Sequence, residues 1–165
     1  MKRVKKRILF AFLLVSLFFV SLQDQEHDHL AEAADSSLDK DVPKNTDCAF
    51  CNMVVYQKKD KMGVFSGQAI KKDDKVVYYD DIGCLLYDEV KNKTTNKKYV
   101  RDYNTLKWIK AEKATYVKTT LASPMDDGYI VFNKASDAKA YVKKNKDSKI
   151  VSYKKVREEM IEKYK

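Results

Sequence analysis

The sequence has little glycine, proline, histidine or tryptophan, and these shortages exclude several classes of protein. Its 165 residues include four glycines, two prolines, two histidines and one tryptophan. So little glycine and proline excludes a collagen-like repeat and argues against a long disordered linker. Apolar residues make up 44% of the chain, which is ordinary for a globular protein. Without an N-terminal segment, the rest suffices for one compact domain or two very small ones.

The charge pattern also argues against a nucleic-acid-binding protein. The formal net charge is +9, and lysine heavily outnumbers arginine. Acidic residues are interleaved with the basic ones, and no groove signature of aromatic residues with arginine is present. We therefore expect no nucleic-acid binding. The pattern indicates a solvated surface that anionic cell envelopes attract.

The first 33 residues are typical of an export signal. Residues 1–7 carry five positive charges, and residues 8–22 carry none. A helix of fifteen residues spans ~22 Å, which is short for a bilayer anchor. The Ala-x-Ala pattern at 31–33 follows a polar stretch, so cleavage and a retained N-terminal anchor both remain open. We predict a signal or anchor over 1–33, a polar lead-in over 34–46 and an extracytoplasmic location. Membrane contact is expected only through the N-terminal segment.

The two histidines lie in the segment before the candidate cleavage site. They are His27 and His29. If cleavage occurs there, the mature protein has no imidazole to bind zinc or copper(II) or to act as a general base. If the segment stays, His-Asp-His is either a weak metal-loading site or a solvated spacer.

Residues 47–165 predict an α+β domain. Apolar and β-branched runs predict strands, and helices are expected after Asp80-Asp81 and after Ser136 or Asp137. The strand-like runs are 53–56, 76–79, 99–103, 129–132 and 149–153. The halves, about 47–103 and 104–165, repeat a strand, helix, strand order. We therefore expect duplicated ββαβ-like units packed into one small domain.

The cysteine-rich stretch at 48–53 is the main candidate site. Cys48 and Cys51 could bind a soft metal, act as a redox dithiol or form a disulfide. A redox pair usually lies at the start of a helix, whereas residues 53–56 favour a strand. In a strand, positions 51 and 53 point to one face, so Cys51 and Met53 could share one ion.

Two further sulfur-bearing residues are candidates. Met125 lies in a turn between Pro124 and Asp126, where core packing explains a methionine poorly, so it is a candidate thioether ligand. Cys84 lies near the start of the first helix, off that helix's apolar stripe. A third thiol ligand and a buried structural thiol both remain open for it.

No hydrolytic constellation is visible. The paired acids Asp80-Asp81 and Asp126-Asp127 are interpreted as a helix cap and a turn. We predict that the protein is not an enzyme.

Five motifs, in order, resemble the NosL family of nitrous-oxide reductase accessory proteins. They are Cys48-x-x-Cys51-x-Met53, Tyr79-Asp80-Asp81-Ile82-Gly83-Cys84-Leu85, Val100-Arg101-Asp102-Tyr103 with Trp108-Ile109, Ala114-x-Tyr116-Val117 and Pro124-Met125. The resemblance implies an exported chaperone that binds Cu(I) and delivers it to the copper centre of nitrous-oxide reductase. It also implies two ββαβ units. The implied ligands are Cys51, Met53 and Met125, with Cys48 as an additional thiol.

The chain departs from the family in one respect, and two other functions remain as alternatives. Many members are lipoproteins, but this chain lacks a cysteine at the signal junction. Expected partners are an apo copper enzyme such as nitrous-oxide reductase and, as a candidate donor, a membrane copper transporter. The first alternative is an extracytoplasmic thiol–disulfide oxidoreductase that uses Cys48 and Cys51. The second is a passive envelope module with a stable Cys48–Cys51 disulfide and no metal affinity.

Overall fold

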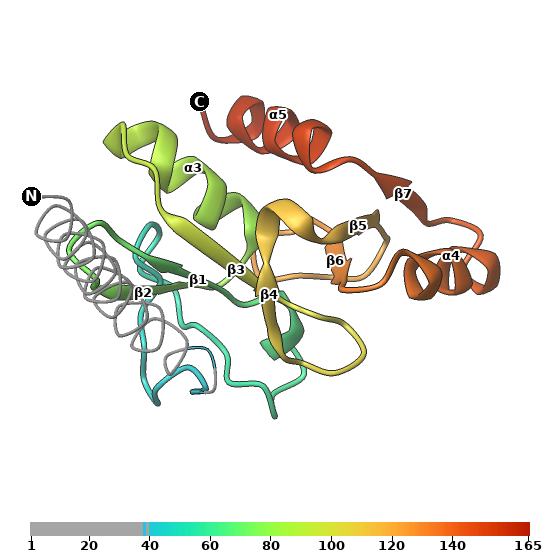
Figure 1. The fold of residues 1–165 in the computed structure, drawn as a ribbon, viewed down its shortest axis with the longest axis horizontal. Helices are drawn as coiled ribbons and strands as arrows, with labels where there is room; N and C mark the ends of the chain where they lie inside the picture. Colours follow the sequence, from blue (N-terminus) through green and yellow to red (C-terminus); the bar gives the residue numbers. More distant parts are fainter. Residues whose placement is uncertain (1–37, 39) are drawn as a thin grey trace, which may run out of the picture. The chain divides into compact units, whose positions relative to one another are not determined.

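Two antiparallel sheets and three helices make up the described part of the chain (Figure 1). The computed structural model describes Leu38 and residues 40–165, so the predicted signal or anchor lies outside the described residues. Among these described residues, none of the helices combines the length and hydrophobicity that crossing a membrane requires. Leu38–Lys165 form one compact unit.

The first three strands of each sheet have the same arrangement, which confirms the duplication. The first sheet has the order β2-β1-β3-β4, and the second has the order β6-β5-β7. In each, the first strand in sequence is central and pairs antiparallel with the next two. The strands are β1 (Gly67–Ile70), β2 (Val76–Tyr79), β3 (Lys97–Arg101), β4 (Trp108–Lys110), β5 (Thr115–Lys118), β6 (Tyr129–Phe132) and β7 (Lys149–Val151). β4 pairs with β3, so the first sheet extends into the second half of the sequence.

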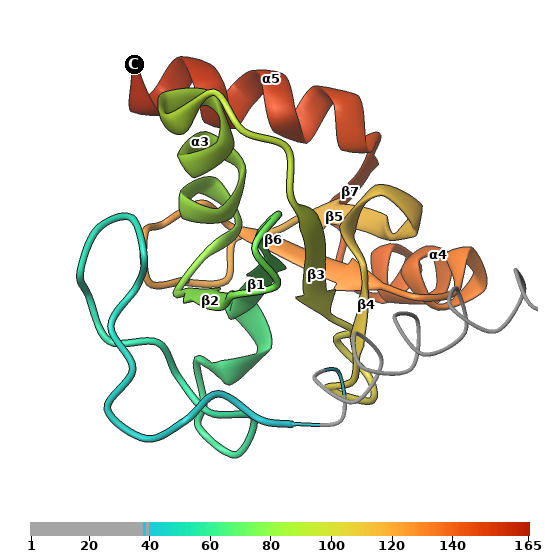
Figure 2. The same cartoon turned by 60° about the vertical axis from the view of Figure 1, so that its left-hand side comes forward.

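The helices connect and cover these sheets. α3 (Ile82–Asn92) follows β2, α4 (Ala135–Lys144) follows β6, and α5 (Tyr153–Tyr164) ends the chain. Figure 2 shows α5 lying alongside α3, and α3 also packs on β1 and β2. α4 packs on all three strands of the second sheet. Two short 3-10 helices, η1 (Gly63–Phe65) and η2 (Ala111–Lys113), complete the fold.

The helix boundaries follow from local hydrogen bonds. Asp81 caps α3 by accepting from the Ile82 N–H at 2.8 Å. Ser152 caps α5 by accepting from the Lys155 N–H, and the strand predicted over 149–153 therefore ends at Val151. The predicted cap at Ser136 or Asp137 is wrong, because α4 already begins at Ala135 and has no side-chain cap.

A buried cation fastens the start of the described chain to the first sheet. Arg101 is 2% exposed, pairs with Asp41 and lies 3.8 Å from the centre of the Trp108 ring. The Trp108 indole N–H donates to the Lys40 carbonyl at 3.0 Å, and Val42 is fully buried. Because a buried cation needs a partner, Asp41 and the residues around it are part of the packed structure.

Candidate metal site

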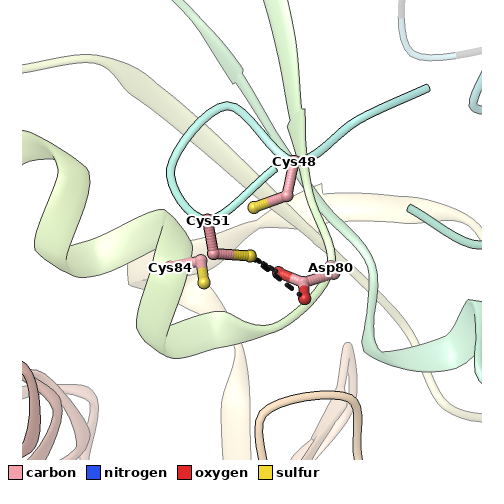
Figure 3. Close-up of side chains that lie close together, drawn as sticks. All are labelled: Cys48, Cys51, Asp80 and Cys84. Atoms are coloured by element: carbon pink, nitrogen blue, oxygen red, sulfur yellow. Dashed lines mark hydrogen bonds between the residues drawn. The ribbon is translucent and has the colours of Figure 1, made fainter. Parts of the chain in front are cut away.

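Four potential metal-binding side chains meet at one point of the fold. The ligand atoms of Cys48, Cys51, Asp80 and Cys84 all lie within 4.8 Å of one another. Figure 3 shows that they come from the cysteine-rich loop, the segment after β2 and the start of α3. All three cysteines are free thiols. The structure thus brings together residues that are up to 36 positions apart in the sequence.

A tight turn brings the two loop cysteines to this point. The Cys48 N–H donates to the Met53 carbonyl at 2.7 Å, and the Asn52 N–H donates to the Cys48 carbonyl at 3.0 Å. Asn52 has φ of 61°, a left-handed conformation that asparagine tolerates better than most residues. The Ala49 N–H donates to the Tyr78 carbonyl at 2.9 Å, which attaches the turn to β2.

The strand predicted over 53–56 is wrong. This segment forms only an isolated bridge between Asp47 and Val54. The left-handed Asn52 reverses the chain between Cys51 and Met53. The alternation of side chains along a strand therefore cannot be used to place these two sulfurs on one face.

The other two side chains lie on either side of the start of α3. Asp80 directly precedes the capping residue, and Cys84 lies in the first turn of the helix. The N-terminal end of a helix favours negative charge through its unpaired N–H groups and its dipole. This position therefore suits a carboxylate and a thiolate at the same metal.

Burial differs among the four side chains. Cys48, Asp80 and Cys84 are almost completely buried, whereas Cys51 is half-buried. Cys51 therefore lies at the boundary between the cluster and solvent. An ion that enters from solvent meets this thiol first.

Hydrogen bonding separates the acidities of the three thiols. The Cys84 thiol donates to Cys48, and this bond, with N–H donors of Cys51, Asp80 and Phe50, lowers the pKa of Cys48 from 9.0 to about 7. Burial raises the pKa of Cys51 to about 11. The bond to Cys48, followed by burial, raises the pKa of Cys84. Near pH 7, Cys48 is therefore the thiol that ionises most readily, while Cys51 and Cys84 stay protonated.

The two candidate thioether residues differ in exposure. Met53 directly follows the cysteine turn and is 47% exposed. Met125 is half-buried, and its N–H donates to the Asp81 carboxylate at 3.1 Å. Since Asp81 caps the helix that carries Cys84, the backbone of Met125 is tied to the same helix start.

Two buried carboxylates hold the Met125 loop in place. Asp81 accepts from Ser123 and Met125 of the loop, in addition to capping α3. Asp127 of the loop in turn accepts from the Gly83 N–H of α3 at 2.7 Å. The loop and the helix start therefore each provide a carboxylate to the other. Burial, and then the nearby Asp127 charge, raises the pKa of Asp81 to about 7.

The end of α5 completes this attachment. The Lys163 ammonium lies 2.8 Å from the Asp127 carboxylate and donates to the Met125 carbonyl at 2.7 Å. The Tyr164 hydroxyl donates to Asp127 at 3.2 Å. A Cβ on Gly83 would lie 2.4 Å from the Asp127 carboxylate and 2.5 Å from the Tyr164 ring. A larger residue at position 83 would therefore force Asp127 or Tyr164 to shift where the loop, α3 and α5 meet.

Sequence reasoning placed Cys48, Cys51 and Cys84 among the candidates but missed Asp80. Asp80 was interpreted as part of a helix cap, a role that Asp81 alone fulfils. The spacing of Asp80 and Cys84, four residues apart across a helix start, is the signal that could have indicated a shared site.

The fold and these donors define a small two-sheet α+β protein with a thiol-rich site suited to a soft metal. The chain belongs to the NosL family, which it matches over residues 39–161. The solved structure of the copper chaperone NosL from Shewanella denitrificans is similar in fold, with a TM-score of 0.56 at 16% identity. The match covers 70% of this chain and 92% of that one. A comparison with curated proteins gives no match. The predicted family and fold are thus confirmed.

Proposed function

We propose that this protein binds Cu(I) and carries it to a copper enzyme outside the cytoplasm, with nitrous-oxide reductase as the first candidate recipient. The observation that supports this most is the meeting of three free thiols at one point of a NosL-family chain. Thiolates and thioethers are the ligands that select Cu(I). The copper chaperone whose fold is similar supports the same cargo.

The proposed Cu(I) ligands are Cys51, Met53 and Met125, with Cys48 as an additional thiol. Cys51 lies at the solvent boundary of the cluster, and Met53, two residues further along the chain, is exposed. Met125 lies in a loop that hydrogen bonds tie to the helix start. Thioethers carry no charge and lose no proton on binding, so such a site competes with protons less than an all-thiolate site.

This arrangement suits transfer better than permanent storage. A ligand of an acceptor protein can reach an ion held at the boundary before the original ligands leave. The protein therefore acts as a carrier and not as an enzyme. An exported protein of this kind receives copper outside the cytoplasm, and a membrane copper transporter is the candidate donor.

A thiol–disulfide oxidoreductase is the second candidate, because the pKa of Cys48 is lowered to about 7. A thiolate is the reactive form of cysteine in such enzymes. However, Cys48 is 1% exposed, and a nucleophilic cysteine must reach its substrate. The burial of this thiol favours the copper carrier.

The test is an anaerobic Cu(I) titration of the reduced full chain, in detergent, against a competing Cu(I) chelator. All proteins carry His27→Ala and His29→Ala, so that the N-terminal histidines do not contribute. This background is compared with Cys51→Ser and Met125→Leu, and with Met62→Leu as a methionine control outside the site.

Binding of one Cu(I) that both Cys51→Ser and Met125→Leu weaken, and Met62→Leu does not, would support the carrier and its ligands. Binding lost only in Cys51→Ser would keep the carrier and remove Met125 from the site. If the protein does not compete with the chelator at any ratio, the copper proposal is wrong. The reduction potential of the Cys48–Cys51 pair would then be measured to test the oxidoreductase.

A further inference from the structure

The positive charge of this protein is concentrated in one short part of the chain. Residues 134–157 contain nine lysine and arginine side chains and two aspartates, a net charge of +7. The whole chain has a formal net charge of +9, so all the other residues together contribute only +2. The excess charge therefore belongs to one segment and not to the surface as a whole.

The fold gathers this segment on one side of the described unit. The segment comprises α4, β7 and the start of α5, and α4 packs directly on β7. Figures 1 and 2 both show these elements on the side away from the cysteine turn, which is drawn in cyan. All nine basic side chains are exposed. We call them the basic face: Lys134, Lys139, Lys143, Lys144, Lys146, Lys149, Lys154, Lys155 and Arg157.

The charges of the basic face are not balanced by neighbouring acids. Among the described residues, only Lys154 of these nine pairs with a carboxylate, that of Glu158 at 4.0 Å. Lys139 and Lys143 lie four residues apart in α4, where like charges repel and lower the stability of a helix. A lysine on an edge strand such as β7 discourages strand pairing, but that explains only Lys149. An anion outside this chain would relieve the repulsion.

An apolar side chain is exposed within the same face. Ile150 lies on β7 and is 44% exposed. It pairs with Val117 of β5, and directly paired residues project from the same side of a sheet. Val117 and Ala138 of α4 belong to one hydrophobic cluster. Ile150 therefore projects on the side of the sheet that α4 covers, among the lysines.

We propose that the basic face binds the surface of an anionic phospholipid bilayer, with Ile150 reaching its apolar boundary. Each lysine near an anionic bilayer strengthens binding by about five-fold. Long lysine side chains also let an apolar neighbour approach the lipid while their ammonium groups stay among the headgroups. Membrane contact was predicted only for the N-terminal segment, so this contact is an additional one. It does not depend on copper binding.

The composition of the face fits a bilayer better than a nucleic acid or a single small anion. Eight of its nine basic side chains are lysines, whereas nucleic-acid surfaces rely heavily on arginine and on aromatic stacking. The cavity that includes Lys144 also contains the Asp137 side chain, so it does not select an anion. The charges instead spread over a helix, a strand and a second helix, which suits a broad anionic surface.

The test measures hydrogen–deuterium exchange of the full chain in lipid nanodiscs, peptide by peptide, by mass spectrometry. One set of discs contains phosphatidylcholine alone, and the other contains phosphatidylcholine mixed with phosphatidylglycerol. The N-terminal segment is present in every sample, so its own membrane contact is the same for all variants. We expect peptides from α4 and β7 to exchange more slowly in the anionic discs. This slowing should disappear at high salt, which screens the attraction.

Two sets of four substitutions remove the same charge from different places. The set in the basic face is Lys139→Gln, Lys143→Gln, Lys146→Gln and Lys149→Gln. The control set, at exposed lysines elsewhere, is Lys59→Gln, Lys72→Gln, Lys75→Gln and Lys107→Gln. The first set should abolish the slowing, because four lysines together account for more than about 100-fold in binding. The control set should retain it.

A second pair of variants tests the apolar contact. Ile150→Thr keeps a β-branched residue in β7 and should weaken the slowing, because the exposed apolar surface is lost. Val54→Thr makes the matching change at another exposed position and should leave the slowing unchanged. Thermal unfolding checks that every variant folds.

The outcomes separate this proposal from a general effect of charge. Slower exchange that requires anionic lipid, low salt and the lysines of the basic face would support it. Equal exchange in the two kinds of disc, or an equal loss in both four-lysine sets, would overturn it. An equally strong slowing by a DNA duplex in place of the discs would also overturn it, in favour of a general polyanion surface. Slowing in Ile150→Thr equal to that of the wild type would refute the role of Ile150. The Cu(I) titration tests the carrier separately from all of these results.

Discussion

Asp127→Asn is the substitution that tests most directly how the Met125 loop is held. The Asp127 carboxylate is fully buried and accepts hydrogen bonds from Gly83, Lys163 and Tyr164. An asparagine keeps the size but turns one acceptor into a donor and removes the charge. Breaking a buried pair of this kind costs about 3 kcal/mol. The partner Lys163 side chain is 41% exposed, so water compensates its lost partner and the cost stays at the lower end of the range.

Differential scanning calorimetry and Cu(I) affinity measure the effect of Asp127→Asn. We expect the melting temperature to fall by about 12 °C, since 1 kcal/mol corresponds to about 4 °C in a domain of this size. Cu(I) affinity should fall as well, because the loop that carries Met125 is released. Asp126→Asn is the matched control, because Asp126 is exposed and has φ of 56°, which asparagine also tolerates. An equal change in the two variants would refute the proposed attachment of the loop.

Three further predictions concern other parts of the structure. Cys84→Ala removes the bond that stabilises the Cys48 thiolate, so the pKa of Cys48 should rise from about 7 towards 9.0. The wild-type thiolate, followed by ultraviolet absorbance, is lost as the pH falls through about 7, and an unchanged midpoint in the variant would contradict the bond. Asp41→Asn leaves Arg101 buried without its anionic partner and should lower the free energy of unfolding by about 3 kcal/mol. Urea denaturation measures this loss. A loss under about 0.5 kcal/mol, as at ordinary surface positions, would contradict the prediction. Gly83→Ala should destabilise by about 1–3 kcal/mol through overlap with its neighbours, measured by thermal unfolding, whereas a gain in stability would show that the close contact yields easily.

Much of the fold was predictable from local pattern. The β-branched and aromatic runs at 76–79 and 129–132 and the capping Asp81 depend on neighbouring residues only, and the structure has both strands and the cap. The strand predicted over 53–56 was wrong because its β-branched residues follow a left-handed Asn52. Residues with a high strand preference form a strand only where they can pack on a neighbouring sheet. This segment joins neither sheet and makes a single bridge, between Asp47 and Val54.

The candidate site was predictable only in part, for a similar reason. The spacing of Cys48 and Cys51 is local, so it was visible in the sequence. The approach of Cys84 to these thiols depends on where β2 ends and on how the cysteine turn attaches to that strand. The role of Asp80 was hidden because an acid before a helix is usually interpreted as a cap.

The family, the duplicated strand–helix units and the sulfur-bearing residues could all be predicted before the structure was known, because they depend on residue type and short-range spacing. Packing of distant segments places Asp80 against the Cys51 thiol and lets Asp81 and Asp127 join the Met125 loop to α3. The same packing buries Cys48 and leaves Cys51 at the solvent boundary. Burial and the pairing of buried charges arise when distant segments pack together, and no local pattern records which segments will meet.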